Sequence, residues 1–287
     1  METELTYYPG CSLHGSSSFY DTSVRTVLSR FGVSLREIED WSCCGSTSAS
    51  KTDHRLGIAL PARNLGLAQK EGRAVLAPCS SCYSKLVAAN VAMKEEPRLL
   101  KSINEELEYP YTSELPIRNI LELLLDGLEA KDAPRIVNPL KGLKPVSYYG
   151  CLLTRIPGYE PKEDIENPVM MDKILKKIGA DPIDWSYKTD CCGASSAVAD
   201  RPVAINLIKK LLDEAIESEA MAIVTSCPMC QLNLDMYQEQ AAPARPIPVY
   251  FITEMVGVAL GLREEMKKEI RRHFVDGVSL LSELGVL

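Results

Sequence analysis

The sequence predicts an α/β fold made of two duplicated, pseudo-symmetric domains with cysteines at the ends of strands. Three observations predict it: ten cysteines form two matching sets of five, similar residues flank the matching cysteines, and short β-prone runs alternate with amphipathic segments. At 287 residues and 46% apolar content, two modest cores are expected. The expected domains are residues 1–140, with a C-terminal connector, and residues 141–287.

The duplication rests on the spacing of the cysteines. The first set is Cys11, Cys43, Cys44, Cys79 and Cys82, and the second set is Cys151, Cys191, Cys192, Cys227 and Cys230. The first members are offset by 140 residues and the other four pairs by 148, so no cysteine is left over. The difference falls at residues 156–168, a Pro- and Gly-containing insertion of the kind that a loop tolerates.

Short β-prone runs lead into the cysteine motifs of both halves. Residues 5–8 and 146–149 precede Gly-Cys pairs, and residues 74–77 and 222–225 precede the two CxxC pairs. Residues 55–70 and 204–217 have the periodicity of amphipathic helices. Each half is therefore predicted to be an α/β unit with its cysteines at one edge.

The connector between the halves is expected at residues 109–145. It holds one predicted helix, over residues 118–128, followed by Pro134, Pro139 and Pro145. Prolines spaced in this way indicate a loop rather than a further helix.

Charge and hydropathy argue against two classes of partner. The net charge is -7 and the Lys and Arg residues are scattered, so there is no basic stripe for nucleic acid. Residues 1–10 carry Glu2 and Glu4 without an apolar run, which is unlike a signal or transit peptide. The most apolar stretch, residues 249–262, is short for a membrane span and is interrupted by Glu254. We expect a soluble cytoplasmic protein, in which ten cysteines are not a disulfide framework.

The motif types favour a metal centre. A CxxC pair between a strand and a helix lies near unpaired helix N–H groups and the positive end of the helix dipole, which favours thiolate. Adjacent cysteines reach one centre together only through a tight turn, which the Gly after each Cys-Cys pair permits. Zinc accepts four ligands and an ordinary cubane cluster is held by four cysteines, so five per set favour a polynuclear centre of unusual shape.

Three other interpretations stay open. A zinc site built from four of the five cysteines of a set is one. A metal-free dithiol exchanger, suggested by the segment from Cys227 to Cys230, is another, although it leaves the adjacent cysteines unexplained. Buried free cysteines acting as small apolar residues are the third, and the matching of the two sets weighs against them.

The doubled pattern of Cys, Cys-Cys-Gly and Cys-x-x-Cys resembles the cysteine-rich CCG-domain family, and the whole chain resembles the family of heterodisulfide reductase B subunits. Residues 138–144 and 248–253 also match. The resemblance implies two noncubane [4Fe-4S] clusters, one held by each set of five cysteines. It implies cleavage of the mixed disulfide of coenzyme M and coenzyme B, each cluster taking up one sulfur, as in methanogenesis. Because related chains also serve sulfate reducers and sulfur oxidisers, a related thiol disulfide is an alternative substrate.

Electrons are expected to come from partner proteins, because the chain lacks the bacterial ferredoxin run C-x2-C-x2-C-x3-C. The resemblance implies the heterodisulfide reductase C subunit, with cubane iron–sulfur clusters, and the flavin-bearing A subunit, with a hydrogenase or formate dehydrogenase as further candidates. An alternative function is electron transfer within a related redox complex, in which the clusters of this chain do not contact substrate.

Two further residues are candidates for substrate binding. His14 and Arg155 follow Cys11 and Cys151 closely enough to meet the acidic tails of a substrate. The alternative is that both are ordinary surface side chains.

Overall fold

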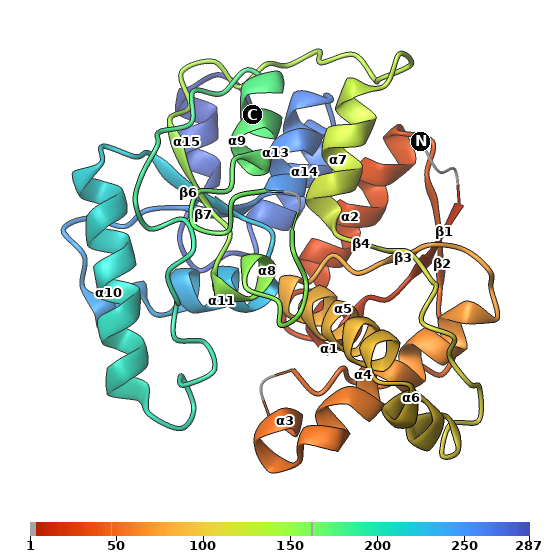
Figure 1. Cartoon of the computed structure of the whole chain (residues 1–287). Helices are drawn as coiled ribbons and strands as arrows, with labels where there is room; N and C mark the ends of the chain where they lie inside the picture. The colour runs from red at the N-terminus through yellow and green to blue at the C-terminus, as the bar shows by residue number, and fades with distance from the viewer. Residues whose placement is uncertain (1–3, 47, 162) are drawn as a thin grey trace.

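The computed structural model describes residues 4–46, 48–161 and 163–287 and places one parallel β-sheet in each half (Figure 1). The first sheet has the order β2-β1-β3-β4, with strands β1 (Glu4–Tyr7), β2 (Ser34–Glu37), β3 (Val75–Leu76) and β4 (Ile117–Arg118). The second has the order β5-β6-β7, with strands β5 (Pro145–Tyr148), β6 (Ala222–Thr225) and β7 (Val249–Phe251). Val146 of β5 also forms a parallel bridge with Ile183, which takes the place that β2 has in the first sheet.

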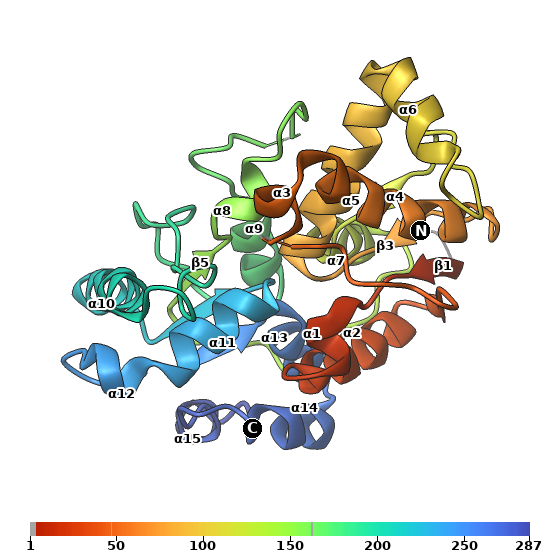
Figure 2. The same ribbon diagram turned by 90° about the horizontal axis from the view of Figure 1, so that it is seen from below.

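Helices connect the strands and cover the sheets (Figures 1 and 2). In the first half they are α1 (Gly10–His14), α2 (Ser18–Arg30), α3 (Ala49–Thr52), α4 (His54–Gln69), α5 (Ser80–Glu95), α6 (Pro97–Asn104) and α7 (Ile120–Glu129). In the second half they are α8 (Cys151–Thr154), α9 (Met170–Lys177), α10 (Arg201–Glu217), α11 (Pro228–Met236), α12 (Gln238–Ala241), α13 (Ile252–Ala259), α14 (Arg263–Ile270) and α15 (Val278–Glu283). The predicted duplicated α/β fold is therefore confirmed.

The two halves exchange contacts reciprocally. Helix α5 of the first half packs on α8 of the second, and α11, the counterpart of α5, packs on α1, the counterpart of α8. In the same way α13 packs on α2, and α7, the counterpart of α13, packs on α9. This reciprocity is the pattern that a pseudo-twofold axis between the halves produces, and it brings α1, α5, α8 and α11 together near the middle of the molecule (Figure 1).

Side-chain caps decide where several helices begin. The Asp53 carboxylate accepts the Leu56 N–H at 2.7 Å at the start of α4, and Asp200 does the same for Val203 at the start of α10. Asn119 and Glu122 form a capping box at the start of α7. The helix predicted from residue 118 consequently begins at Ile120, with residue 118 in β4.

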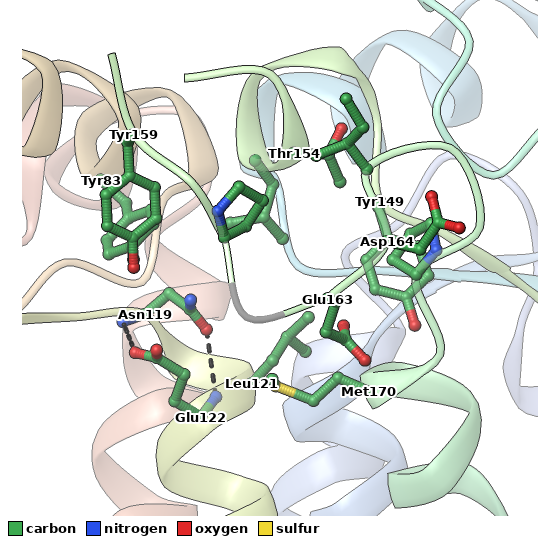
Figure 3. Close-up of a pocket in the computed structure, with 14 residues that line it drawn as sticks. Tyr83, Asn119, Leu121, Glu122, Tyr149, Thr154, Tyr159, Glu163, Asp164 and Met170 are labelled. Atoms are coloured by element: carbon green, nitrogen blue, oxygen red, sulfur yellow. Dashed lines mark hydrogen bonds between the residues drawn. The ribbon is translucent and has the colours of Figure 1, made fainter. Parts of the chain in front are cut away.

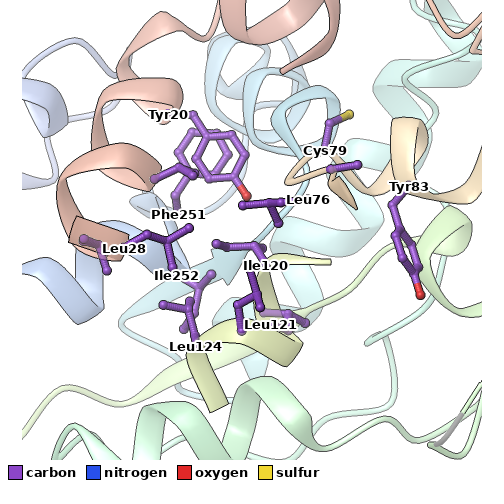
Figure 4. Packing of buried hydrophobic residues seen from close by; sticks show 14 of the residues in the cluster. Tyr20, Leu28, Leu76, Cys79, Tyr83, Ile120, Leu121, Leu124, Phe251 and Ile252 are labelled. Atoms are coloured by element: carbon purple, nitrogen blue, oxygen red, sulfur yellow. The ribbon is translucent and has the colours of Figure 1, made fainter. Parts of the chain in front are cut away.

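The hydrophobic core is shared by the two halves. Tyr20 of α2 stacks on Phe251 of the second half, with ring centroids 3.9 Å apart, and buried side chains of β3, α7 and α13 surround the pair (Figure 4). A second cluster packs α10 and α11 against the second sheet. The proposed division near residue 140 falls in the connector between α7 and β5, so it separates the sheets but not the core.

Over the described residues, none of the helices combines the length and the hydropathy needed to cross a bilayer. The apolar stretch at residues 249–262 forms β7 and α13, and every residue of α13 is buried.

Candidate metal centre

The five cysteines of the second set surround one cavity of about 70 Å³ at the carboxyl end of the second sheet. The structure thus brings together Cys151, Cys191, Cys192, Cys227 and Cys230. Cys151 begins α8 just after β5, and Cys227 precedes α11 just after β6, because carboxyl ends of parallel strands meet at one edge. Ser80 of the first half also lines the cavity, which therefore lies where the two halves meet.

The first set repeats this geometry at the carboxyl end of the first sheet. The Sγ atoms of Cys44 and Cys82 lie 3.6 Å apart, the same separation as between Cys192 and Cys230. The pKa of Tyr8 is raised, mainly by burial. The neighbouring thiols of the first set add to this effect, in the order Cys82, Cys44, Cys43 and Cys11. The pKa of Tyr148 is raised in the same way, by burial and the thiols of the second set. Each tyrosine therefore lies close to the thiols of one cysteine set.

The paired tyrosines also fix the loops that carry the adjacent cysteines. Tyr8 donates its hydroxyl hydrogen to the Ser42 carbonyl at 2.8 Å, and Tyr148 donates to the Asp190 carbonyl at 2.7 Å. Sequence reasoning did not assign these tyrosines a role. Their offset of 140 residues, the same as that of Cys11 and Cys151, is the signal that would have found them.

Two glycines let the backbone approach the sulfur atoms closely. Gly10 and Gly150 have φ of +70° and +68°, which favours glycine. A Cβ atom at Gly10 would lie 2.6 Å from the Cys82 Sγ, and one at Gly150 would lie 3.0 Å from the Cys230 Sγ. Both sites thus have a cradle that any side chain at these positions would fill.

The two cysteine sets also touch each other. Cys79 and Cys227, both buried, lie in different halves and are close enough to shift each other's pKa, which is raised for Cys79 and lowered for Cys227. The buried Tyr20 hydroxyl bridges the same turns, since it lies 3.1 Å from the Pro78 carbonyl and 2.9 Å from the Ser226 carbonyl. The two candidate centres are therefore neighbours rather than independent sites at opposite ends of the molecule.

Hydrogen bonds between the thiols of each set lower the pKa of some cysteines and raise the pKa of others. Hydrogen bonds from Cys43 and Cys82 lower the pKa of Cys44 to about 3, and a hydrogen bond from Cys151 lowers the pKa of Cys191 to about 6. The donating thiols Cys43 and Cys151 have raised pKa values for the same reason. Each set therefore holds a thiol ready to ionise, the form that binds metal.

The residues present fit an iron–sulfur centre. Five thiols converge on one cavity, glycine provides the space beside them, and each set contains a readily ionised member. In the described part of the chain, no group of three or more Cys, His, Asp or Glu side chains is arranged so that it could hold a metal ion. The ligand role of the ten cysteines stays a prediction.

The structure places His14 and Arg155 beside their sets, where each already has intramolecular partners. His14 Nε2 lies 2.9 Å from Glu37 Oε1, and its ring packs edge-on against Trp41. Arg155 donates to the carbonyl and the hydroxyl of Thr189, each at 3.2 Å, and pairs with an exposed glutamate. Both side chains are nearly half exposed, and their contact with a substrate stays a prediction.

The comparisons with known proteins agree with the duplication. A family model described as "Cysteine-rich domain" (CCG) matches residues 5–87 and 146–235, which is more than half of the chain. A hypothetical protein from Helicobacter pylori has the same fold, with a TM-score of 0.75 and 13% identity, over 96% of this chain and 52% of that one. This chain thus spans about half the length of that structure, and the likeness concerns the fold alone.

Two curated relatives match nearly end to end. The membrane anchor subunit of the 8-methylmenaquinol:fumarate reductase of Wolinella succinogenes is 31% identical, over 91% of this chain and 94% of that protein. The B subunit of the ferredoxin:CoB-CoM heterodisulfide reductase of Methanosarcina mazei is 27% identical, over 98% of this chain and 97% of that protein. The chain therefore belongs to the cysteine-rich CCG-domain family that includes heterodisulfide reductase B subunits.

Proposed function

We propose that this chain is the catalytic iron–sulfur subunit of a heterodisulfide reductase, cleaving the CoM-S-S-CoB disulfide or a related thiol disulfide. The observation that carries the proposal is the presence of two sets of five thiols that meet between the halves. Relatives at 25–27% identity over nearly the full chain bear heterodisulfide reductase names. We propose two noncubane [4Fe-4S] clusters as the cofactors, one for each set.

The reaction R–S–S–R′ + 2 e⁻ + 2 H⁺ → R–SH + R′–SH needs a place for two sulfur atoms and a source of two electrons. Bound clusters would supply single electrons and iron positions open to sulfur. The chain holds the two ligand sets side by side, with Cys79 against Cys227 at the centre. Cys11, Cys43 and Cys191 are exposed, so at least one thiol of each set is accessible from solvent.

Electrons would come from partner subunits, since the relatives are themselves named as subunits of complexes. We propose the C subunit with cubane clusters and the flavin-bearing A subunit of a heterodisulfide reductase, with a hydrogenase or formate dehydrogenase as further candidates. Cytoplasm is the proposed compartment, because ten thiols require a reducing environment to remain ligands.

The test is anaerobic purification of the chain with its natural neighbours, followed by iron and sulfide analysis and a turnover assay. We expect about four iron atoms per half and release of both thiols from CoM-S-S-CoB with reduced viologen as donor. Cys44→Ala and Cys192→Ala should each remove or convert one cluster and leave the other intact. Iron near zero with zinc present would refute the cofactor, and iron signals unaffected by either thiol would refute the catalytic role.

A second candidate function is electron transfer within a quinol-linked reductase. The 31% identity to a member of a fumarate reductase complex favours it. The same purified complex separates the two functions, because each predicts a different acceptor. Reduction of fumarate without any release of thiols from the disulfide would support the second candidate.

A further inference from the structure

Lys188 is a buried lysine that neither the sequence patterns nor the proposed reaction assigns a role. The residue is 2% exposed and lies in the loop that leads into Cys191. Its ammonium group is 2.8 Å from the Asn167 side-chain oxygen, 2.9 Å from Asp184 Oδ1 and 3.7 Å from Asp172 Oδ2. A lysine buried in this way is stable only with such partners, so its position is strongly determined.

The backbone of Lys188 is engaged as well as its side chain. Its carbonyl accepts the N–H groups of Tyr149 and Gly150, at 2.8 and 3.1 Å. The Tyr149 hydroxyl in turn donates to Asp172 Oδ2 at 3.0 Å and accepts the Met171 N–H at 2.7 Å. The contacts close a ring from the Lys188 carbonyl through Tyr149 and Asp172 back to the Lys188 ammonium group. We call Lys188, Tyr149 and Asp172 the brace.

The brace connects the two loops that deliver three of the five thiols of the second set. Tyr149 lies two residues before Cys151, and Lys188 lies three residues before Cys191. The Tyr149 side chain lines the cysteine cavity on one side. On the other it lines a small cavity of about 50 Å³, beside Thr154 and Glu163 (Figure 3). Tyr149 of the brace therefore lies between the cysteine cavity and the cavity lined by the inserted loop.

Among its described residues, the first half has no counterpart of the brace. Pro9 takes the place of Tyr149 at the 140-residue offset, and proline has no N–H to donate. Exposed Asp40 takes the place of Lys188 at the 148-residue offset, and both its carboxylate and its carbonyl accept from Arg63. The duplicated sites are thus supported differently, although their cysteines match.

We propose that Lys188, Tyr149 and Asp172 are positioning residues for the second cysteine set alone, holding the Cys151 loop and the Cys191–Cys192 loop at a fixed separation. The brace acts on the chain's own loops and does not depend on which group the thiols bind. The proposal thus goes beyond the proposed function and can be tested without it.

The test measures site-specific alkylation of thiols in the reduced, cluster-free full-length chain by mass spectrometry. Tyr149→Phe removes one buried hydrogen bond of the brace, and we expect Cys192 and Cys230 to react about two- to tenfold faster. Cys44 and Cys82, the matching thiols of the first half, should react at the wild-type rate. Tyr111→Phe is the matched control, because Tyr111 is a tyrosine of the first half that is as little exposed as Tyr149, and its hydroxyl donates to Asn90.

A second pair of variants guards against a simple loss of folding. Lys188→Met should accelerate alkylation of the second set more than Tyr149→Phe does, and Lys188→Arg should restore part of the protection. Lys177→Met is the control, because it removes the half-exposed pair between Lys177 on α9 and Glu129 on α7. In the loaded protein, Lys188→Met should lose iron from one half only.

Equal acceleration of thiols in both halves, or no acceleration in either brace variant, would overturn the proposal. A wild-type chain without iron would refute the proposed cofactor, yet the alkylation result would still stand. The two failures are therefore distinguishable.

Discussion

Replacement of Gly10 by alanine tests whether the tight approach of backbone to sulfur is what shapes the first site. The new Cβ atom would lie 2.6 Å from the Cys82 Sγ, whereas unstrained contacts need about 3.5 Å or more. The sulfur must therefore move by about 1 Å, several times the roughly 0.2 Å that metal–ligand distances tolerate. We expect the first site to lose its iron while the second keeps it.

The stability cost has two parts. A non-glycine residue at the Gly10 φ of +70° costs about 1–2 kcal/mol, and overpacking against a buried thiol costs about 1–3 kcal/mol more. Gly150→Ala should act likewise on the second site, with a smaller packing cost because its contact is 3.0 Å. Gly72→Ala is the control, since Gly72 has φ of +65° but no atom within 4 Å of the added Cβ.

The assay combines anaerobic iron and sulfide analysis with urea unfolding of the cluster-free chain. Gly10→Ala should hold about half of the wild-type iron, whereas Gly72→Ala should hold all of it and lose only the backbone part of the stability. Full iron content in Gly10→Ala, with an unfolding midpoint equal to that of Gly72→Ala, would refute the close-approach argument.

Three other predictions concern stability, measured by unfolding of the cluster-free chain. Tyr20→Phe leaves two buried carbonyls without their shared donor and should lower the free energy of unfolding by about 1–3 kcal/mol; no change would contradict the bridge. Asn119→Ala removes the capping box of α7 and should cost about 0.5–2 kcal/mol, with Asn119→Asp retaining most of it. Burial opposes the His273 cation, but the adjoining Glu254 carboxylate outweighs it and raises the pKa of His273. The stability from this pair should therefore be complete below about pH 6.5 and be lost as pH rises through the raised pKa, and His273→Gln should abolish that slope.

Much of the fold could be predicted because an element expected in one half is expected again at the matching position of the other half. The runs at residues 5–8, 146–149 and 222–225 are predicted as strands and form β1, β5 and β6 within one residue at each end. The sequence does not predict β2, since it is a short edge strand with polar residues and a half-exposed surface. β4, with two residues, is too short to leave a periodic pattern.

The gathering of each cysteine set at one sheet edge follows from motif spacing, whereas the contact between the sets does not. Cys79 meets Cys227 only because each half packs its helices on the other, and nothing local in the sequence encodes that exchange. Lys188 escapes prediction for a related reason. Its partner Asp172 lies on α9, and the matching position of α2 at the 148-residue offset is Val24, so the repeat gives no sign of the ion pair.

The reciprocal packing explains how one fold can hold two thiol-rich sites side by side. Thiolates brought together in a buried interior repel each other, and burial alone disfavours their charge. Cys79 and Cys227 are the N-cap residues of α5 and α11, so both helices direct their positive ends at the shared boundary, where they favour the ionised thiols. An unpaired half would expose the α5 or α11 surface that now packs on the partner half's α8 or α1. The contacts that join the halves therefore also position the N-termini of α5 and α11, whose positive ends stabilise ionised thiols at the boundary.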